Sequence, residues 1–145
     1  MRMESMQFYA GFGKGVIRFP EALFPVEGFR GIHDDPCIRL MVLAAGDERM
    51  AIASVELVNV PQKAISLCQK MIQHETGVPL SRIWIHATHA ISTMHEPGPM
   101  GPPNQRRPET ERDIEQKTCF FAAIEKAMTE AAQKRKNDIQ KLLDR

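Results

Sequence analysis

The sequence has little of what marks several large classes of protein. Its 145 residues include three cysteines, Cys37, Cys68 and Cys119, which lie far apart and form no C-x-x-C pair, so neither a disulfide framework nor a zinc knuckle is indicated. The formal net charge of +1 excludes the strongly basic surface of a nucleic-acid-binding protein. No apolar run is long enough to span a membrane, and the first residues lack a signal-peptide pattern. We therefore expect a cytoplasmic protein with no membrane span and no nucleic-acid partner.

Four short apolar runs predict β-strands. Residues 39–44 and 50–55 flank a polar turn and are expected to form a hairpin. A strand is also predicted over 14–19, where Pro20 closes it, and another over 82–87. The alternating glycines before Val16 precede a strand and do not link a strand to a helix, so they do not indicate a phosphate-binding loop.

Two segments have the apolar spacing of amphipathic helices. The first starts at Pro61, with Asn59 as its expected N-cap, and ends before Gly77. The second starts near Glu109, and its apolar positions form one stripe. The stripe comprises Ile114, Phe121, Ile124, Met128 and Ala131, and Ile139, Leu142 and Leu143 extend it.

The order of these elements predicts a single α/β domain over residues 1–145, with a mixed β-sheet and two main helices. Such a domain could also form half of a larger layered α/β/β/α core. Two helices cannot cover both faces of a mixed sheet well. We therefore expect association through the uncovered face, either in a homo-oligomer or with a partner subunit.

The segment from His86 to Pro99, which comprises the end of the last predicted strand and the loop after it, carries the densest group of chemically active side chains. It contains His86, His89 and His95, three of the five histidines, and Glu96 adds a carboxylate. Neutral imidazole is the commonest protein ligand for metals, and a strand end can hold it rigidly beside open coordination positions. The spacing is not H-E-x-x-H on a helix. A metal site therefore competes with a second interpretation, in which His86 is a hydrogen-bonded core residue and His95 and Glu96 are solvated loop residues.

Several segments resemble one known family in the correct order. They are Gly13-Lys14-Gly15-Val16-Ile17, Gly31-Ile32-His33-Asp34 before the strand at 39–44, Ala53-Ser54-Val55-Glu56-Leu57 before Pro61, and Ala87-Thr88-His89-x-x-Ser92 after an isoleucine-rich strand. This series is similar to the N-terminal part of the neutral/alkaline, non-lysosomal ceramidases, whose T-H-T-H-S-G-P segment corresponds to the last of them. The resemblance covers residues 1–108, whereas 109–145 are expected to form a long helix or helices.

The resemblance implies a zinc-dependent hydrolase of amide bonds with a small-molecule substrate. It implies that His89 ligates zinc, which lowers the pKa of a bound water to about 7 and polarises the amide carbonyl. We take His33 and His86 as further candidate ligands, although His33 also fits a polar turn. His95 and Glu96 are the candidate catalytic residues.

The chain departs from the family pattern at the same loop. The second histidine of the motif falls on Ile91, which can neither bind zinc nor transfer protons, and the glycine falls on Thr93. The family's other zinc ligands and catalytic residues lie downstream in a much longer chain. A partner chain or a second copy is therefore expected to complete the site. The alternative is a non-catalytic binding or assembly subunit on a ceramidase-like scaffold.

Overall fold

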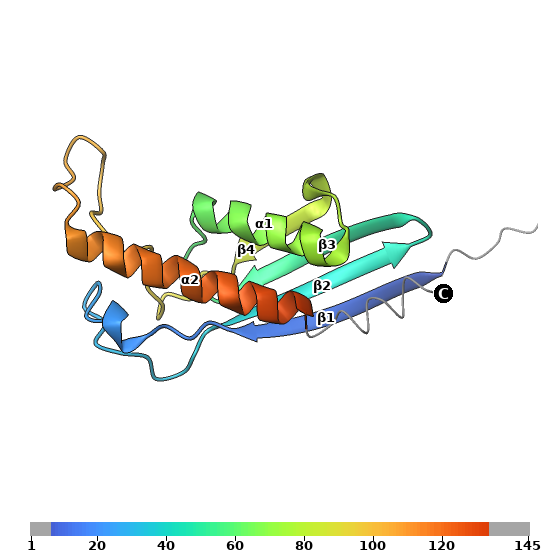
Figure 1. Ribbon diagram of the computed structural model, residues 1–145, viewed down its shortest axis with the longest axis horizontal. Coiled ribbons are helices and arrows are strands. Elements are labelled where there is room, and N and C mark those ends of the chain that lie inside the picture. Colours follow the sequence, from blue (N-terminus) through green and yellow to red (C-terminus); the bar gives the residue numbers. More distant parts are fainter. Residues whose placement is uncertain (1–6, 134–145) are drawn as a thin grey trace, which may run out of the picture.

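The computed structural model describes residues 7–133, which form one four-stranded sheet and two helices (Figure 1). The strands are β1 (Phe8–Val16), β2 (Cys37–Ala45), β3 (Glu48–Val55) and β4 (Ile83–Ala87), and the helices are α1 (Gln62–Thr76) and α2 (Glu111–Gln133). The strands lie in chain order; β1, β2 and β3 pair antiparallel, and β4 pairs parallel with β3. Helix α1 is the crossover that a parallel pair requires. The predicted α/β domain with a mixed sheet and two main helices is confirmed.

Strand β1 begins earlier than predicted and contains the alternating glycines at 11, 13 and 15. β1 begins at Phe8, and its residues at 11, 13 and 15 are buried, so their positions face the helices. A Cβ atom added to Gly15 would lie 1.7 Å from the backbone oxygen of Ala127 in α2. The strand predicted over 14–19 therefore has the wrong bounds: glycine weakens an isolated strand, but here it lets a helix backbone pack directly on the sheet.

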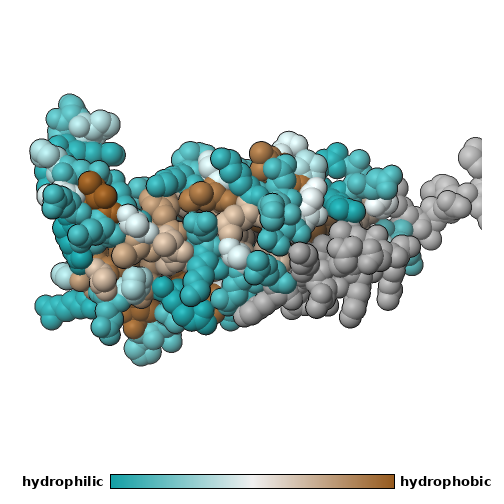
Figure 2. Space-filling view, viewed as in Figure 1, coloured by the Kyte–Doolittle hydropathy of each residue, from teal (hydrophilic) through white to brown (hydrophobic). Residues whose placement is uncertain are grey.

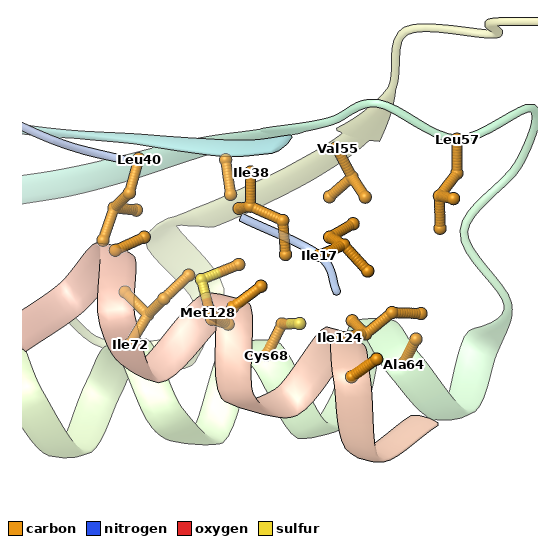
Figure 3. Packing of buried hydrophobic residues seen from close by; sticks show 14 of the residues in the cluster. Ile17, Ile38, Leu40, Val55, Leu57, Ala64, Cys68, Ile72, Ile124 and Met128 are labelled. Atoms are coloured by element: carbon orange, nitrogen blue, oxygen red, sulfur yellow. The ribbon is translucent and has the colours of Figure 1, made fainter. Parts of the chain in front are cut away.

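Both helices cover the same face of the sheet and enclose the core. Helix α2 lies over β1 and β2, and α1 packs beside α2 and against β4 (Figure 1). Figure 3 shows side chains of the sheet, such as Leu40 and Val55, pointing toward the two helices, which contribute Ile72 (α1) and Met128 (α2) to the same cluster. All four of these residues are at most 2% exposed. The core is thus one apolar layer between the sheet and the helix pair.

Helix α1 ends as predicted but begins one residue late. Gly77 adopts the left-handed conformation, with φ 71°, and donates its N–H to the carbonyl of Gln73 at 2.9 Å. The N-cap of α1 is Pro61, which has an extended backbone and makes no side-chain capping hydrogen bond. The prediction of Asn59 as the N-cap is therefore wrong, because Pro61 occupies the cap and leaves Asn59 two residues before it.

Helix α2 begins at a capping box. The hydroxyl of Thr110 accepts the N–H of Asp113 at 3.2 Å, and the carboxylate of Asp113 accepts the N–H of Thr110 at 2.8 Å. Arg107 adds two hydrogen bonds to the same carboxylate, of 2.5 and 2.9 Å. The hydrogen bonds from Arg107, followed by those from Thr110, hold the pKa of Asp113 well below its usual range.

The apolar stripe of α2 is buried except at its first member. Phe121, Ile124, Met128 and Ala131 belong to the core, but Ile114 is 53% exposed. The first turns of α2 extend past the ends of the strands (Figure 1). The positions at 139, 142 and 143 that extend the predicted stripe lie outside the described residues.

The face of the sheet opposite the helices is uncovered, and its middle is apolar. Phe12, Met41, Ile52 and Trp84 are in register on the four adjacent strands and form one row across it. Phe12 is 53% exposed and Trp84 is 73% exposed. By contrast, hydrophilic residues cover most of the side that Figures 1 and 2 show, with hydrophobic patches between them. The described sheet therefore has one covered face and one uncovered face, as expected.

Candidate functional site

The histidine-rich loop leaves the sheet at the carboxyl ends of the parallel strands β3 and β4. The N–H of Thr88 donates to the carbonyl of Val55 at 2.9 Å, and the N–H of Ala90 donates to that of Leu57 at 3.3 Å. These bonds continue the pairing beyond the strands and fix the start of the loop. The region beyond the carboxyl ends of parallel strands is where open α/β sheets commonly bind ligands.

The His89 ring is held by one nitrogen and open at the other. Its Nδ1 lies 2.7 Å from the backbone carbonyl oxygen of Val58, 31 residues earlier in the chain. Because a carbonyl can only accept, Nδ1 carries the hydrogen and the neutral ring keeps a lone pair on Nε2. Residue 89 is exposed. An imidazole bonded to a backbone carbonyl through one nitrogen is typical of metal-ligating histidines.

His95 is held in the same way by a carboxylate. Its Nδ1 lies 3.1 and 3.2 Å from the two carboxylate oxygens of Glu27, and its backbone N–H donates to Glu27 at 2.9 Å. The side chain of His95 is 42% exposed and that of Glu27 is 18% exposed. Nε2 of His95 is therefore available for proton transfer, as is required of a general base.

Backbone strain coincides with these two contacts. Within residues 7–133, Glu27 and His89 are the non-glycine residues with positive φ, at 48° and 59°. A non-glycine residue in this region costs on the order of 1–3 kcal/mol and persists where the surroundings impose it, most often at functional sites. One of the two is the predicted zinc ligand, and the other orients the predicted catalytic histidine.

The remaining predicted residues lie apart from these contacts. His86 is exposed on β4, where the alternation of the strand places it on the open face, paired with Ser54 of β3. His33 lies in the loop before β2, and its side chain is 97% exposed. The hydrogen bond to Asp34 raises the pKa of His33. Glu96 is half-buried and, among the described residues, its carboxylate makes no hydrogen bond or ion pair.

A further carboxylate at the end of β3 has a structural pairing. Glu56 accepts the backbone N–H of Cys37 at 2.8 Å and forms an ion pair with Arg39. Burial alone would raise the pKa of Glu56, but the hydrogen bonds from Arg39 and Cys37 outweigh it and lower the pKa. These contacts connect the end of β3 to β2, and both partners stabilise the ionised carboxylate of Glu56.

The fit to a zinc ion is partial. His89 has the open Nε2 and the fixed tautomer of a ligand. A catalytic zinc site needs three protein ligands. Across the described residues, no group of three or more histidine, cysteine, aspartate or glutamate side chains is placed to hold a metal ion. Residues 7–133 therefore offer one well-prepared ligand and not a complete set.

The comparison with known proteins shows the fold. No protein-family model and no curated protein matches the chain. It is similar to a solved structure of a ceramidase complexed with C2, with a TM-score of 0.56 and 16% sequence identity. The match covers 90% of this chain and 22% of that chain. The chain thus has a ceramidase-like fold and spans about a fifth of the length of that ceramidase. No helix in the described part is long and apolar enough to cross a membrane.

The partners of the two histidines could not be found by reading the sequence. Any residue offers a backbone carbonyl, so nothing in the type of Val58 marks it as a partner of His89. Glu27 lies 68 residues before His95. The sequence around Glu27 has one unusual local feature: a glutamate precedes Gly28 in a short turn, where asparagine is the usual residue.

Proposed function

We propose that this chain is a zinc-dependent hydrolase of amide bonds in small molecules, completed by a second copy or by a partner chain. The observation that carries the proposal is the His89 ring, whose Nδ1–H is bonded to Val58 and whose Nε2 is open. The ceramidase-like fold supports the reaction class, because the solved neighbour is a ceramidase. When bound, zinc supplies the activated water and the carbonyl polarisation that amide hydrolysis needs.

His95 and Glu96 are the proposed catalytic residues. The His95 ring is oriented with Nε2 free to exchange a proton. Glu96 follows it directly and supplies a carboxylate without another described partner. His33 and His86 remain proposed ligands in the assembled site, since both side chains are accessible to another chain.

The open face of the sheet supports the need for a second chain. A hollow of about 460 Å³ on this side is lined by Trp84 and by apolar side chains such as Phe8, Leu43 and Met50, together with the charged residues Glu48, Arg49 and Arg82. A contiguous apolar patch on a soluble domain marks an interaction site. Two sheets pack face to face with their apolar sides interleaved. A sheet from another chain would cover this face and bring new side chains to the ends of the strands.

The experiment is a zinc measurement on the purified, untagged full chain in its native assembly, with and without the substitution His89→Ala. We expect stoichiometric zinc in the wild type and background zinc in the variant. Hydrolysis of small N-acyl amides that release a fluorescent amine should fall in parallel. His74→Ala is the matched control, because His74 is exposed at the end of α1, beside Glu75, and should change neither result.

A wild-type assembly without zinc and without amidase activity would contradict the hydrolase and favour a non-catalytic binding or assembly subunit. The open apolar face is the observation that favours this second function, because it supports an interaction without requiring chemistry. The two functions differ in what His89→Ala does. In a binding subunit, the variant keeps both its assembly state and its partner.

A further inference from the structure

The residue that holds His95 occupies an unusual position in a tight turn. Val26 and Phe29 exchange two backbone hydrogen bonds, of 3.1 and 2.8 Å, around Glu27 and Gly28. Both central residues have positive φ, 48° and 83°, as in a type I′ turn. Such turns favour Asn-Gly, because asparagine and glycine adopt this backbone far more readily than glutamate does. The turn itself therefore does not account for glutamate at this position.

The segment leading into the turn is anchored to the core. Val26 is buried in the hydrophobic cluster. The buried amide of Gln116 in α2 donates to the carbonyls of Leu23 at 2.7 Å and Pro25 at 2.9 Å. The turn and the histidine loop lie at the same end of the molecule, near the start of α2 (Figure 1). Glu27 is thus presented to His95 from a fixed base.

The contact between the two residues fixes both the position and the tautomer of the imidazole. One carboxylate accepts the backbone N–H of His95 at 2.9 Å and lies within 3.2 Å of ring Nδ1 through both of its oxygens. A carboxylate partner on Nδ1 places the proton there and leaves the lone pair of the neutral ring on Nε2, an arrangement shared by oriented general bases.

We infer that Glu27 is a positioning residue for the amide hydrolysis proposed above, on which this inference rests. It orients His95 so that Nε2 takes a proton from water while the water oxygen bonds to the amide carbon. The carbon–nitrogen bond then breaks, and Nε2 returns the proton to the departing nitrogen. The products are a carboxylic acid and an amine, and the imidazole is regenerated.

The test compares Glu27→Asn and Glu27→Gln in the full-length assembly. Asparagine suits the turn but is too short to reach His95, so the melting temperature should not fall while kcat drops about 10- to 100-fold with little change in KM. Glutamine keeps the reach and one accepting oxygen, so it should restore part of kcat. Glu21→Gln, in the 3-10 turn Glu21–Leu23, is the control and should resemble the wild type.

NMR of the His95 ring nitrogens supplies a readout that needs no substrate. At a pH where the ring is neutral, the wild type should show hydrogen on Nδ1, and Glu27→Asn should show a mixture of tautomers. Unchanged kcat and an unchanged tautomer in Glu27→Asn would overturn the inference and leave the hydrolase standing. A wild type that hydrolyses no amide would overturn the hydrolase and the base role of His95, while the tautomer alone would still decide whether Glu27 positions the ring.

Discussion

Replacing Gly15 with alanine tests how closely α2 packs on β1. The added Cβ would lie 1.7 Å from the carbonyl oxygen of Ala127, and ordinary contact begins at 3.4 Å. A flexible side chain could rotate away, but a helix backbone can only move as a unit. Overpacking of a core costs about 1–3 kcal/mol and sometimes more, so we expect a loss of about 3 kcal/mol. For a chain of this length, that corresponds to a melting temperature lower by roughly 6–12 °C.

Urea unfolding followed by far-ultraviolet circular dichroism measures this loss directly. Gly31→Ala is the matched control, because a Cβ there meets nothing within 4 Å, and its stability should stay within about 0.5 kcal/mol of the wild type. Adding Ala127→Gly to Gly15→Ala should not rescue the protein, since the clash involves the carbonyl and not the methyl group. A Gly15→Ala variant as stable as the wild type would refute direct packing of α2 on this strand.

Two further predictions concern the start of α2 and the open face. Because hydrogen bonds from Arg107 and Thr110 lower the folded-state pKa of Asp113, its contribution to stability is present above a pH of about 4 and is lost as the pH falls toward the folded-state pKa. The gap in melting temperature between wild type and Asp113→Asn should therefore be largest near pH 7 and close in acid; a constant gap would contradict this. Trp84→Glu should lower the mass of the assembly measured by light scattering, and because Trp84 is exposed the domain should stay folded. Ile114→Glu, at the exposed start of α2, should leave that mass unchanged.

Elements with a strong local pattern could be predicted from the sequence. The hairpin of β2 and β3 alternates apolar residues around a short turn, and Gly77 ends α1 through its left-handed backbone. The start of β1 could not be predicted in the same way. Its glycines make sense only against α2, more than a hundred residues later, because the reason for Gly15 is the backbone of Ala127.

In the candidate site, too, local features could be predicted from the sequence and long-range contacts could not. A short motif that includes His89 indicated a ligand, and the structure gives that ring a fixed tautomer. The partners of the rings were not predictable, because the carbonyl of Val58 and the carboxylate of Glu27 reach their histidines across 31 and 68 residues. Sequence patterns show the spacing of residues within one helix or strand, whereas these contacts depend on how separate loops pack against each other.

Backbone strain at the candidate site falls at two positions where glycine would be the unstrained residue. At five other described positions with positive φ, the turns Gly28, Gly46, Gly77, Gly98 and Gly101, the chain carries glycine, which adopts that backbone without strain. At 27 and 89 it carries a glutamate and a histidine instead. Glycine in either place would relieve the backbone but would remove an imidazole or the carboxylate that orients one. Strain of this kind persists only where the surroundings impose it, so the two exceptions favour the hypothesis that positions 27 and 89 require these side chains and not merely a tight loop.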